Sequence, residues 1–69
     1  MDIKVTYKLN QIMYDKNLSF RQLHYMSGVT TSQLNDIANN QRDATVITLC
    51  KIATALKMKP EDIYSYTIL

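Results

Sequence analysis

Apolar residues near the start of the chain recur at the spacing of one helical face. Leu9 follows Val5 by four positions, Ile12 and Met13 follow Leu9 by three and four, and polar residues fill most positions between them. Because an α-helix completes a turn about every 3.6 residues, this spacing brings the four side chains to one side. The pattern predicts a first helix over about residues 5–16.

The next two predicted helices lie on either side of the single glycine. Ser19 precedes the first of them, and Gln22 follows three residues later, which is the spacing of a capping box. Gly28 comes directly after the same helix, where a left-handed residue commonly ends a helix. We therefore expect helices over residues 20–27 and 31–39 with a sharp turn between them.

Two more helices are expected in the second half of the chain. Thr45 can cap a helix over about residues 46–57, whose inward positions are Val46, Leu49, Ile52, Ala53 and Leu56. Pro60 suits the first position of a short helix over residues 60–65, because that position needs no backbone amide. Five helices then account for most of the chain.

The composition supports a single small domain over residues 1–69. A chain of this length can build one modest core, and one glycine with one proline favours helices joined by short turns. The single cysteine, Cys50, excludes an intrachain disulfide, and we expect it to be a small buried apolar residue of the helix over 46–57. We predict an all-α fold.

The chain has no membrane or targeting signal that we can identify. No stretch approaches the roughly 20 apolar residues that cross a bilayer, and the first residues lack the layout of a signal peptide. We expect a soluble, cytoplasmic protein with no membrane partner. The one histidine, His24, has no companion ligands, so we expect a packing or half-exposed role for it and no metal site.

The predicted helix over 31–39 has a polar outer face of short hydrogen-bonding side chains. Two short helices joined by the turn at residues 28–30 form a helix-turn-helix arrangement, and such a polar face can reach the base edges in the major groove. The alternative is an ordinary solvated surface. The candidate base-contacting residues are Thr31, Ser32, Gln33 and Asn35.

Between Leu9 and Ile63 the chain resembles the phage repressor and Cro type of helix-turn-helix domain, also called the xenobiotic-response-element-like (XRE) family. The resemblance lies in Leu9-Asn-Gln-Ile-Met, Leu18-Ser-Phe-Arg-Gln-Leu, Ser27-Gly-Val-Thr-Thr-Ser-Gln-Leu-Asn-Asp-Ile, Ile47-Thr-Leu-Cys-Lys-Ile-Ala-Thr-Ala-Leu and Glu61-Asp-Ile. It implies a compact five-helix, lambda-repressor-like fold whose third helix reads double-stranded DNA. Asn40 stands where most members carry Gly, and Asn also tolerates positive φ.

The resemblance also implies which residues meet DNA. Thr31, Ser32 and Asp36 fall at the usual base-contact positions, with Gln33 and Asn35 beside them. The expected phosphate contacts are Arg21, Thr30, Asn39, Gln41 and Arg42. For Arg42 the alternative is an ordinary surface arginine paired with Asp43.

The charge distribution is the main argument against strong DNA binding. The net charge of +2 is mild, and residues 30–45 contain Arg42 against Asp36 and Asp43, a formal charge of −1. Asp36 is repelled by phosphate, although it can accept a hydrogen bond from the amino group of cytosine.

The function we expect is transcriptional regulation, as a repressor that occupies an operator as a homodimer. Tyr64, Tyr66, Ile68 and Leu69 at the end of the chain either cover the core or form the dimer interface. We expect no enzymatic activity, cofactor or small-molecule substrate, because no catalytic pair, metal cluster or glycine-rich phosphate loop is present. The alternative function is a protein-interaction module on the same fold, whose binding is less sensitive to salt than DNA binding is.

Overall fold

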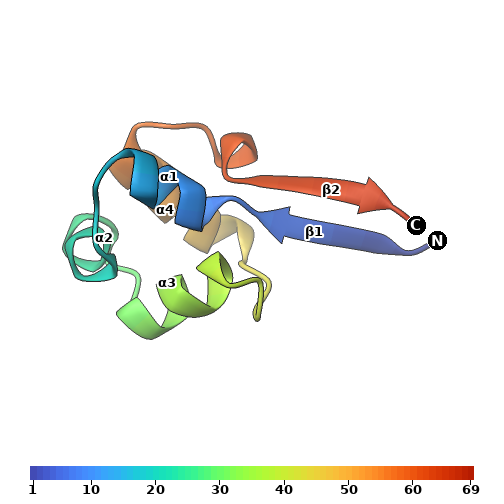
Figure 1. The fold of residues 1–69 in the computed structure, drawn as a ribbon, viewed down its shortest axis with the longest axis horizontal. Helices are drawn as coiled ribbons and strands as arrows, with labels where there is room; N and C mark the ends of the chain where they lie inside the picture. The colour runs from blue at the N-terminus through green and yellow to red at the C-terminus, as the bar shows by residue number, and fades with distance from the viewer.

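The computed structural model describes all 69 residues as a helical body from which two paired strands extend. The two termini lie side by side at the far end of the strands (Figure 1), and the molecule measures 37 × 21 × 21 Å. In chain order the elements are β1 (Ile3–Tyr7), α1 (Leu9–Asp15), α2 (Phe20–Ser27), α3 (Thr31–Ala38), α4 (Val46–Leu56), the 3₁₀ turn η1 (Pro60–Asp62) and β2 (Tyr64–Ile68).

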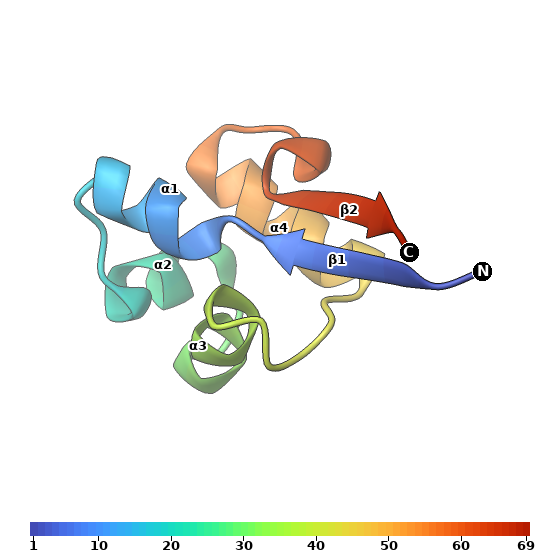
Figure 2. The same ribbon diagram turned by 45° about the vertical axis from the view of Figure 1, so that its right-hand side comes forward.

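The core lies between the four α-helices and Ile63, the residue that follows η1. Figure 2 shows α3 and η1 on opposite sides of this body. Every helix contributes at least one fully buried side chain, and no polar or charged residue is buried. The largest fully buried side chains are Leu9, Leu23, Leu34, Ile37, Ile52 and Ile63.

The predicted caps at the starts of α2, α3 and α4, and the predicted glycine cap at the end of α2, are confirmed. The hydroxyls of Ser19, Thr30 and Thr45 each accept a hydrogen bond from the amide three residues later, at 3.1, 3.2 and 3.2 Å respectively. The Gln22 side chain accepts from the Ser19 amide at 2.8 Å and completes the capping box. Gly28 takes φ +77°, so α2 ends in the left-handed residue that was expected.

The predicted all-α class with five helices is wrong at both ends of the chain. The first helix begins at Leu9, and residues 5–7 belong to β1. The helix expected over 60–65 is only the 3₁₀ turn Pro60–Asp62, because the chain becomes extended from Tyr64. The helices α3 and α4 each end one residue earlier than predicted, and Lys57 closes α4 in a left-handed conformation at φ +57°.

The pairing of β1 with β2 explains why the two ends are extended. The strands are antiparallel, and the register places Ile3 opposite Ile68, Val5 opposite Tyr66, and Tyr7 opposite Tyr64. Because side chains alternate between the faces of a strand, these six apolar residues share one face, and the residues between them form a polar face. In a helix, the same residues would point in different directions around the helix axis. In the strand pair, they all lie on one face.

Two residues of α4 are placed differently from expectation. Cys50 is exposed, so its predicted burial is wrong. Val46 is also exposed, at 75%, because it occupies the first position of α4, where no neighbouring element covers it. The core-facing side of α4 is instead formed by Leu49, Ile52, Ala53 and Leu56.

Candidate nucleic-acid interface

The helix α3 turns its apolar side to the core and its polar side to solvent. Leu34 and Ile37 are at most 1% exposed, which anchors the helix on the body. The other side presents short hydroxyl, amide and carboxylate side chains. Thr31, Ser32 and Asn35 are exposed, and Gln33 and Asp36 are half-buried.

Hydrogen bonds within the turn before α3 fix the direction in which the helix leaves α2. The Ser27 hydroxyl donates to the Leu23 carbonyl at 2.7 Å and accepts from the Val29 amide at 3.2 Å. The Nδ1 atom of His24 lies 2.9 Å from the Val29 carbonyl oxygen, so this nitrogen carries the hydrogen and donates it. His24 is half-buried, as predicted, and its hydrogen bond gives it a structural role in the turn.

The loop after α3 continues the polar surface. The Asn39 amide group donates to the backbone and side-chain oxygens of Asn35 at 3.0 and 3.1 Å, which extends the end of α3. Asn40 takes φ +58°, as its residue type allows. The loop then exposes the side chains of Gln41 and Arg42 beside the exposed side of α3.

Arg42 forms the single ion pair of the chain, and its partner is Asp36. The guanidinium nitrogen lies 3.6 Å from the Asp36 carboxylate, whereas the predicted alternative had been a pair with Asp43. Both side chains remain partly exposed, so the pair contributes little to folding stability. Its importance is local, because the acidic and the basic group of this surface neutralise each other.

Tyr7 contributes to this region although the sequence analysis did not select it. Its hydroxyl accepts a hydrogen bond from the Ala44 amide at 2.9 Å and lies 3.5 Å from the Asp43 carboxylate, to which it donates. Its backbone amide donates to the Asn40 side chain at 2.7 Å. The signal that could have revealed it is the alternation of apolar and polar residues in β1, which predicts a strand ending at Tyr7.

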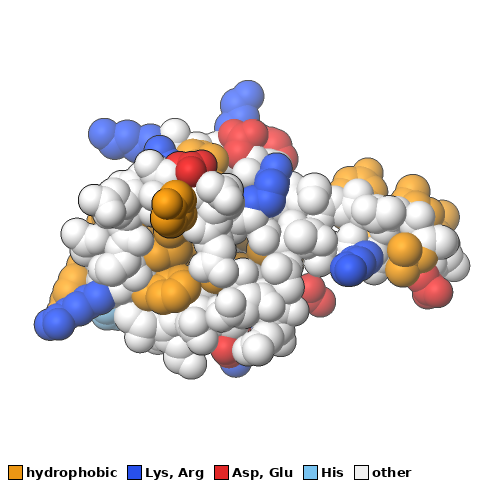
Figure 3. All heavy atoms as spheres, in the orientation of Figure 1, with side chains coloured by type: hydrophobic (Ala, Val, Ile, Leu, Met, Phe, Trp, Pro, Cys, Tyr) orange, Lys and Arg blue, Asp and Glu red, His pale blue; other side chains and the backbone are white.

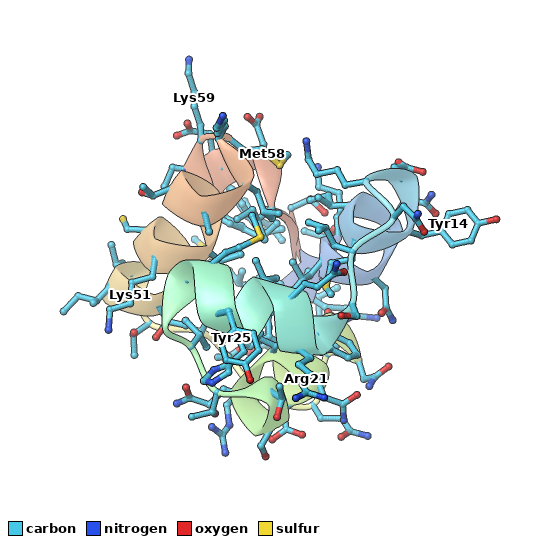
Figure 4. All side chains as sticks on the ribbon, turned by 90° about the vertical axis from the view of Figure 1, so that its left-hand side faces the viewer. Tyr14, Arg21, Tyr25, Lys51, Met58 and Lys59 are labelled. Atoms are coloured by element: carbon cyan, nitrogen blue, oxygen red, sulfur yellow. The ribbon has the colours of Figure 1, made fainter.

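Positive charge is sparse around α3. In Figure 3 the surface below the strands, where α3 lies, is mostly white, and the blue side chains sit mainly at the upper edge and the left. Figure 4 shows that Arg21 extends from α2 toward the side of α3, whereas Lys51 projects sideways and Lys59 lies at the opposite end. Of these three basic residues, Arg21 alone is placed to support contacts made by α3.

The structure therefore gathers most of the predicted interface and separates the predicted tail from it. Side chains of α3, the cap of α3 and the following loop form one continuous surface, with Arg21 beside it. The residues Tyr66, Ile68 and Leu69 lie far out on the strand pair, and only Tyr64 packs against the core. No three histidine, cysteine or acidic side chains are placed to hold a metal ion.

Comparison with known proteins agrees with this geometry. Residues 8–67 match the family of Cro/C1-type helix-turn-helix DNA-binding domains. The chain belongs to this family. Recognition of the phage repressor and Cro type from the sequence is thus confirmed.

Two solved structures are similar to this Cro/C1-type domain. The restriction-modification controller protein C.AhdI from Aeromonas hydrophila is 29% identical with a TM-score of 0.75, and the match covers 80% of this chain and 83% of that one. The transcriptional regulator VanUg is 20% identical with a TM-score of 0.78, covering 100% of this chain and 92% of that one. A comparison with curated protein sequences found no match. No helix of the domain is both long and apolar enough to span a membrane.

Proposed function

We propose that this Cro/C1-type domain is a transcriptional repressor that occupies an operator and reads its sequence with α3 in the major groove. The observation that carries the proposal is the exposed polar side of α3, held at a fixed angle by the hydrogen-bonded turn before it. A helix of this diameter fits the major groove of B-form DNA, and its neighbours then meet the phosphates on either side.

Base recognition is assigned to the outer side of α3. Thr31, Ser32 and Asn35 offer both donors and acceptors, and Gln33 lies beside them. Asp36 offers acceptors only, which suits the amino group of cytosine. Phosphate contacts carry no sequence information, but they fix the register of the helix on the duplex. We assign them to residues around α3: Arg21, Thr30, Asn39, Gln41 and Arg42.

The domain binds DNA as a homodimer in this proposal, and the apolar face of the strand pair is the interface. At the inner end of this face, the side chains of Tyr7 and Tyr64 point toward the core. At the outer end, Tyr66 and Ile68 are 63% and 60% exposed. Hydrophobic side chains are visible along the strands to their tips (Figure 3). An isolated two-stranded ribbon is marginally stable in water, so a second copy that covers this face stabilises both ribbons.

The remaining parts of the proposal follow from the family. A domain of the DNA-binding type acts by occupying its site, so we assign it no reaction of its own and no small-molecule substrate. We place it in the cytoplasm with the DNA that it binds. Its regulation then depends on its concentration or on competition for the operator.

The direct test is fluorescence-anisotropy titration of the full chain against duplexes from the region upstream of its own gene, at several salt concentrations. We expect preference over scrambled duplexes and an affinity that falls steeply with salt, because bound phosphates release counterions. Replacing Thr31 and Ser32 together by Ala should remove the preference and leave most of the salt dependence.

The matched control is Thr54→Ala combined with Ser65→Ala. It removes two exposed hydroxyls that lie outside both the proposed DNA interface and the apolar face of the strand pair, so it should leave DNA binding unchanged. Absence of binding to every duplex at low salt would contradict the proposal. Such a result would favour a protein-interaction module on this fold, for which binding to a protein partner that persists in high salt is the expected signature.

A further inference from the structure

Tyr7 connects the strand pair to the loop between α3 and α4 at two points. Its backbone amide donates to Oδ1 of Asn40 at 2.7 Å, near the start of the loop. Its hydroxyl accepts from the amide of Ala44 at 2.9 Å and donates to the Asp43 carboxylate at 3.5 Å, near the end of the loop. One residue of β1 thus holds both ends of the segment from Asn40 to Ala44.

The two attachment points enclose the residues that are assigned to phosphate. Gln41 and Arg42 lie between them, and both side chains are exposed. The segment has no regular secondary structure of its own, although the Gln41 amide donates to the carbonyl of Asp36 at 2.8 Å. The position of Arg42 relative to α3 therefore depends on how the two ends of the segment are held, together with its ion pair with Asp36.

We infer that Tyr7 is a positioning residue for DNA binding. It keeps Gln41 and Arg42 beside α3, where their side chains can contact phosphate when α3 binds DNA. The inference rests on the proposed DNA-binding function. Ordering a free segment costs conformational entropy at the moment of binding, and a segment that is already held avoids that cost. The hydroxyl of Tyr7 is suited to this task because its ring is fixed in the core at 7% exposure.

A purely structural role for Tyr7 makes a different prediction. Loss of packing or of a hydrogen bond lowers the melting temperature, but it leaves the number of phosphates contacted by the folded protein unchanged. The slope of log affinity against log salt reports that number, so it separates positioning from stability.

The test compares Tyr7→Phe with Tyr14→Phe in the full chain. Tyr7→Phe keeps the ring and the backbone amide and removes only the hydroxyl. Tyr14 is 83% exposed on α1, and the same change there removes a hydroxyl that contacts nothing in the loop. Asn40→Gly acts from the loop side, because Gly accepts the positive φ and removes the acceptor for the Tyr7 amide.

We expect Tyr7→Phe and Asn40→Gly each to weaken operator affinity about two- to tenfold and to flatten the salt dependence by about one phosphate contact. Tyr14→Phe should match the wild type. Amide hydrogen exchange without DNA should show faster exchange at Ala44 in Tyr7→Phe.

Unchanged affinity and slope in both loop variants, with a wild type that binds DNA, would overturn the inference and leave the proposed function standing. A lower melting temperature with an unchanged slope would also overturn it, because the role would then be structural. If the wild type binds no duplex, the proposed function and the inference fail together, and exchange at Ala44 still shows whether Tyr7 holds the loop.

Discussion

At the scale of single residues, the surface proposed to face DNA carries one basic and one acidic side chain that neutralise each other. Arg42 is the one basic residue in the segment from Thr30 to Thr45, and the Asp36 carboxylate lies 3.6 Å from its guanidinium. In the free protein the pair reduces the attraction of Arg42 for any phosphate. We therefore expect Asp36 to lower binding to random DNA, and we expect this cost to be offset only where Asp36 meets a suitable base.

Replacing Asp36 by Asn tests this role. The change removes a negative charge near phosphate and releases Arg42, so affinity for scrambled duplexes should rise about two- to tenfold while the preference for the operator declines. The melting temperature should change little, because exposed ion pairs contribute roughly 0–1 kcal/mol to stability. Anisotropy titrations with operator and scrambled duplexes measure both affinities.

The control for this prediction is Glu61→Gln in η1, on the opposite side of the body from α3. It makes the same change in net charge away from the proposed interface. Equal gains in the two variants would show that net charge alone is responsible, and the specific role of Asp36 would be wrong.

At the scale of elements, the sequence predicted the helices well where local chemistry determines them. Ser19, Gly28, Thr30 and Thr45 act at helix ends through their own backbone or side-chain atoms, so their roles depend on few distant contacts. The exposed polar side of α3 was predicted for a similar reason, since helical periodicity separates it from Leu34 and Ile37.

The strands were missed because two patterns compete near the chain start. Val5, Leu9, Ile12 and Met13 fit a helical face, but Ile3 and Val5 also alternate with polar neighbours, as strand residues do. The pairing of β1 with β2, which joins the two ends of the chain, decides between these patterns. The hydrogen bonds of Tyr7 to the loop after α3 depend on that long-range pairing, so no local pattern could predict them.

The turn between α2 and α3 allows a prediction about a single backbone angle. Gly28 has φ +77°, and a Cβ atom built there meets no atom within 4 Å. Gly28→Ala should therefore destabilise the fold by about 1–2 kcal/mol through backbone strain alone, without steric clash. Urea denaturation followed by circular dichroism measures this loss.

Gly28→Asn is the matched variant, since Asn adopts left-handed angles more readily than Ala. It should recover part of the stability that Gly28→Ala loses. If Asn proves as destabilising as Ala, or Ala proves neutral, the left-handed conformation at this turn is not what limits stability.

At the scale of the whole molecule, the proposed function gives the strand pair and the exposed side of α3 separate tasks. The apolar face of the strands extends into solvent away from the helical body, whereas α3 lies on the side opposite η1. A dimer formed through the strands leaves the exposed side of α3 free in both copies. Each copy then reads one half-site of a symmetric operator.

The proposed interface predicts different effects for neighbouring residues of β2. Ile68→Glu places a charge on the apolar face and should raise the dimer dissociation constant at least about tenfold, because burial of an unpaired charge is costly. Thr67→Glu adds the same charge to the polar face of the same strand, opposite Lys4, and should leave dimerisation unchanged. Sedimentation equilibrium at several protein concentrations distinguishes the two, and an equal response of both variants would place the interface elsewhere.

The central claim is that α3 and the loop after it form the DNA interface. The most direct test adds an operator duplex to the protein and follows the shifts of its backbone amides in the NMR spectrum. We predict that the largest changes fall in residues 30–36 and 39–45, with a smaller group at the start of α2. Amides of η1 should change little. Changes concentrated on the strand pair or on the exposed side of α4, with α3 unaffected, would contradict the account.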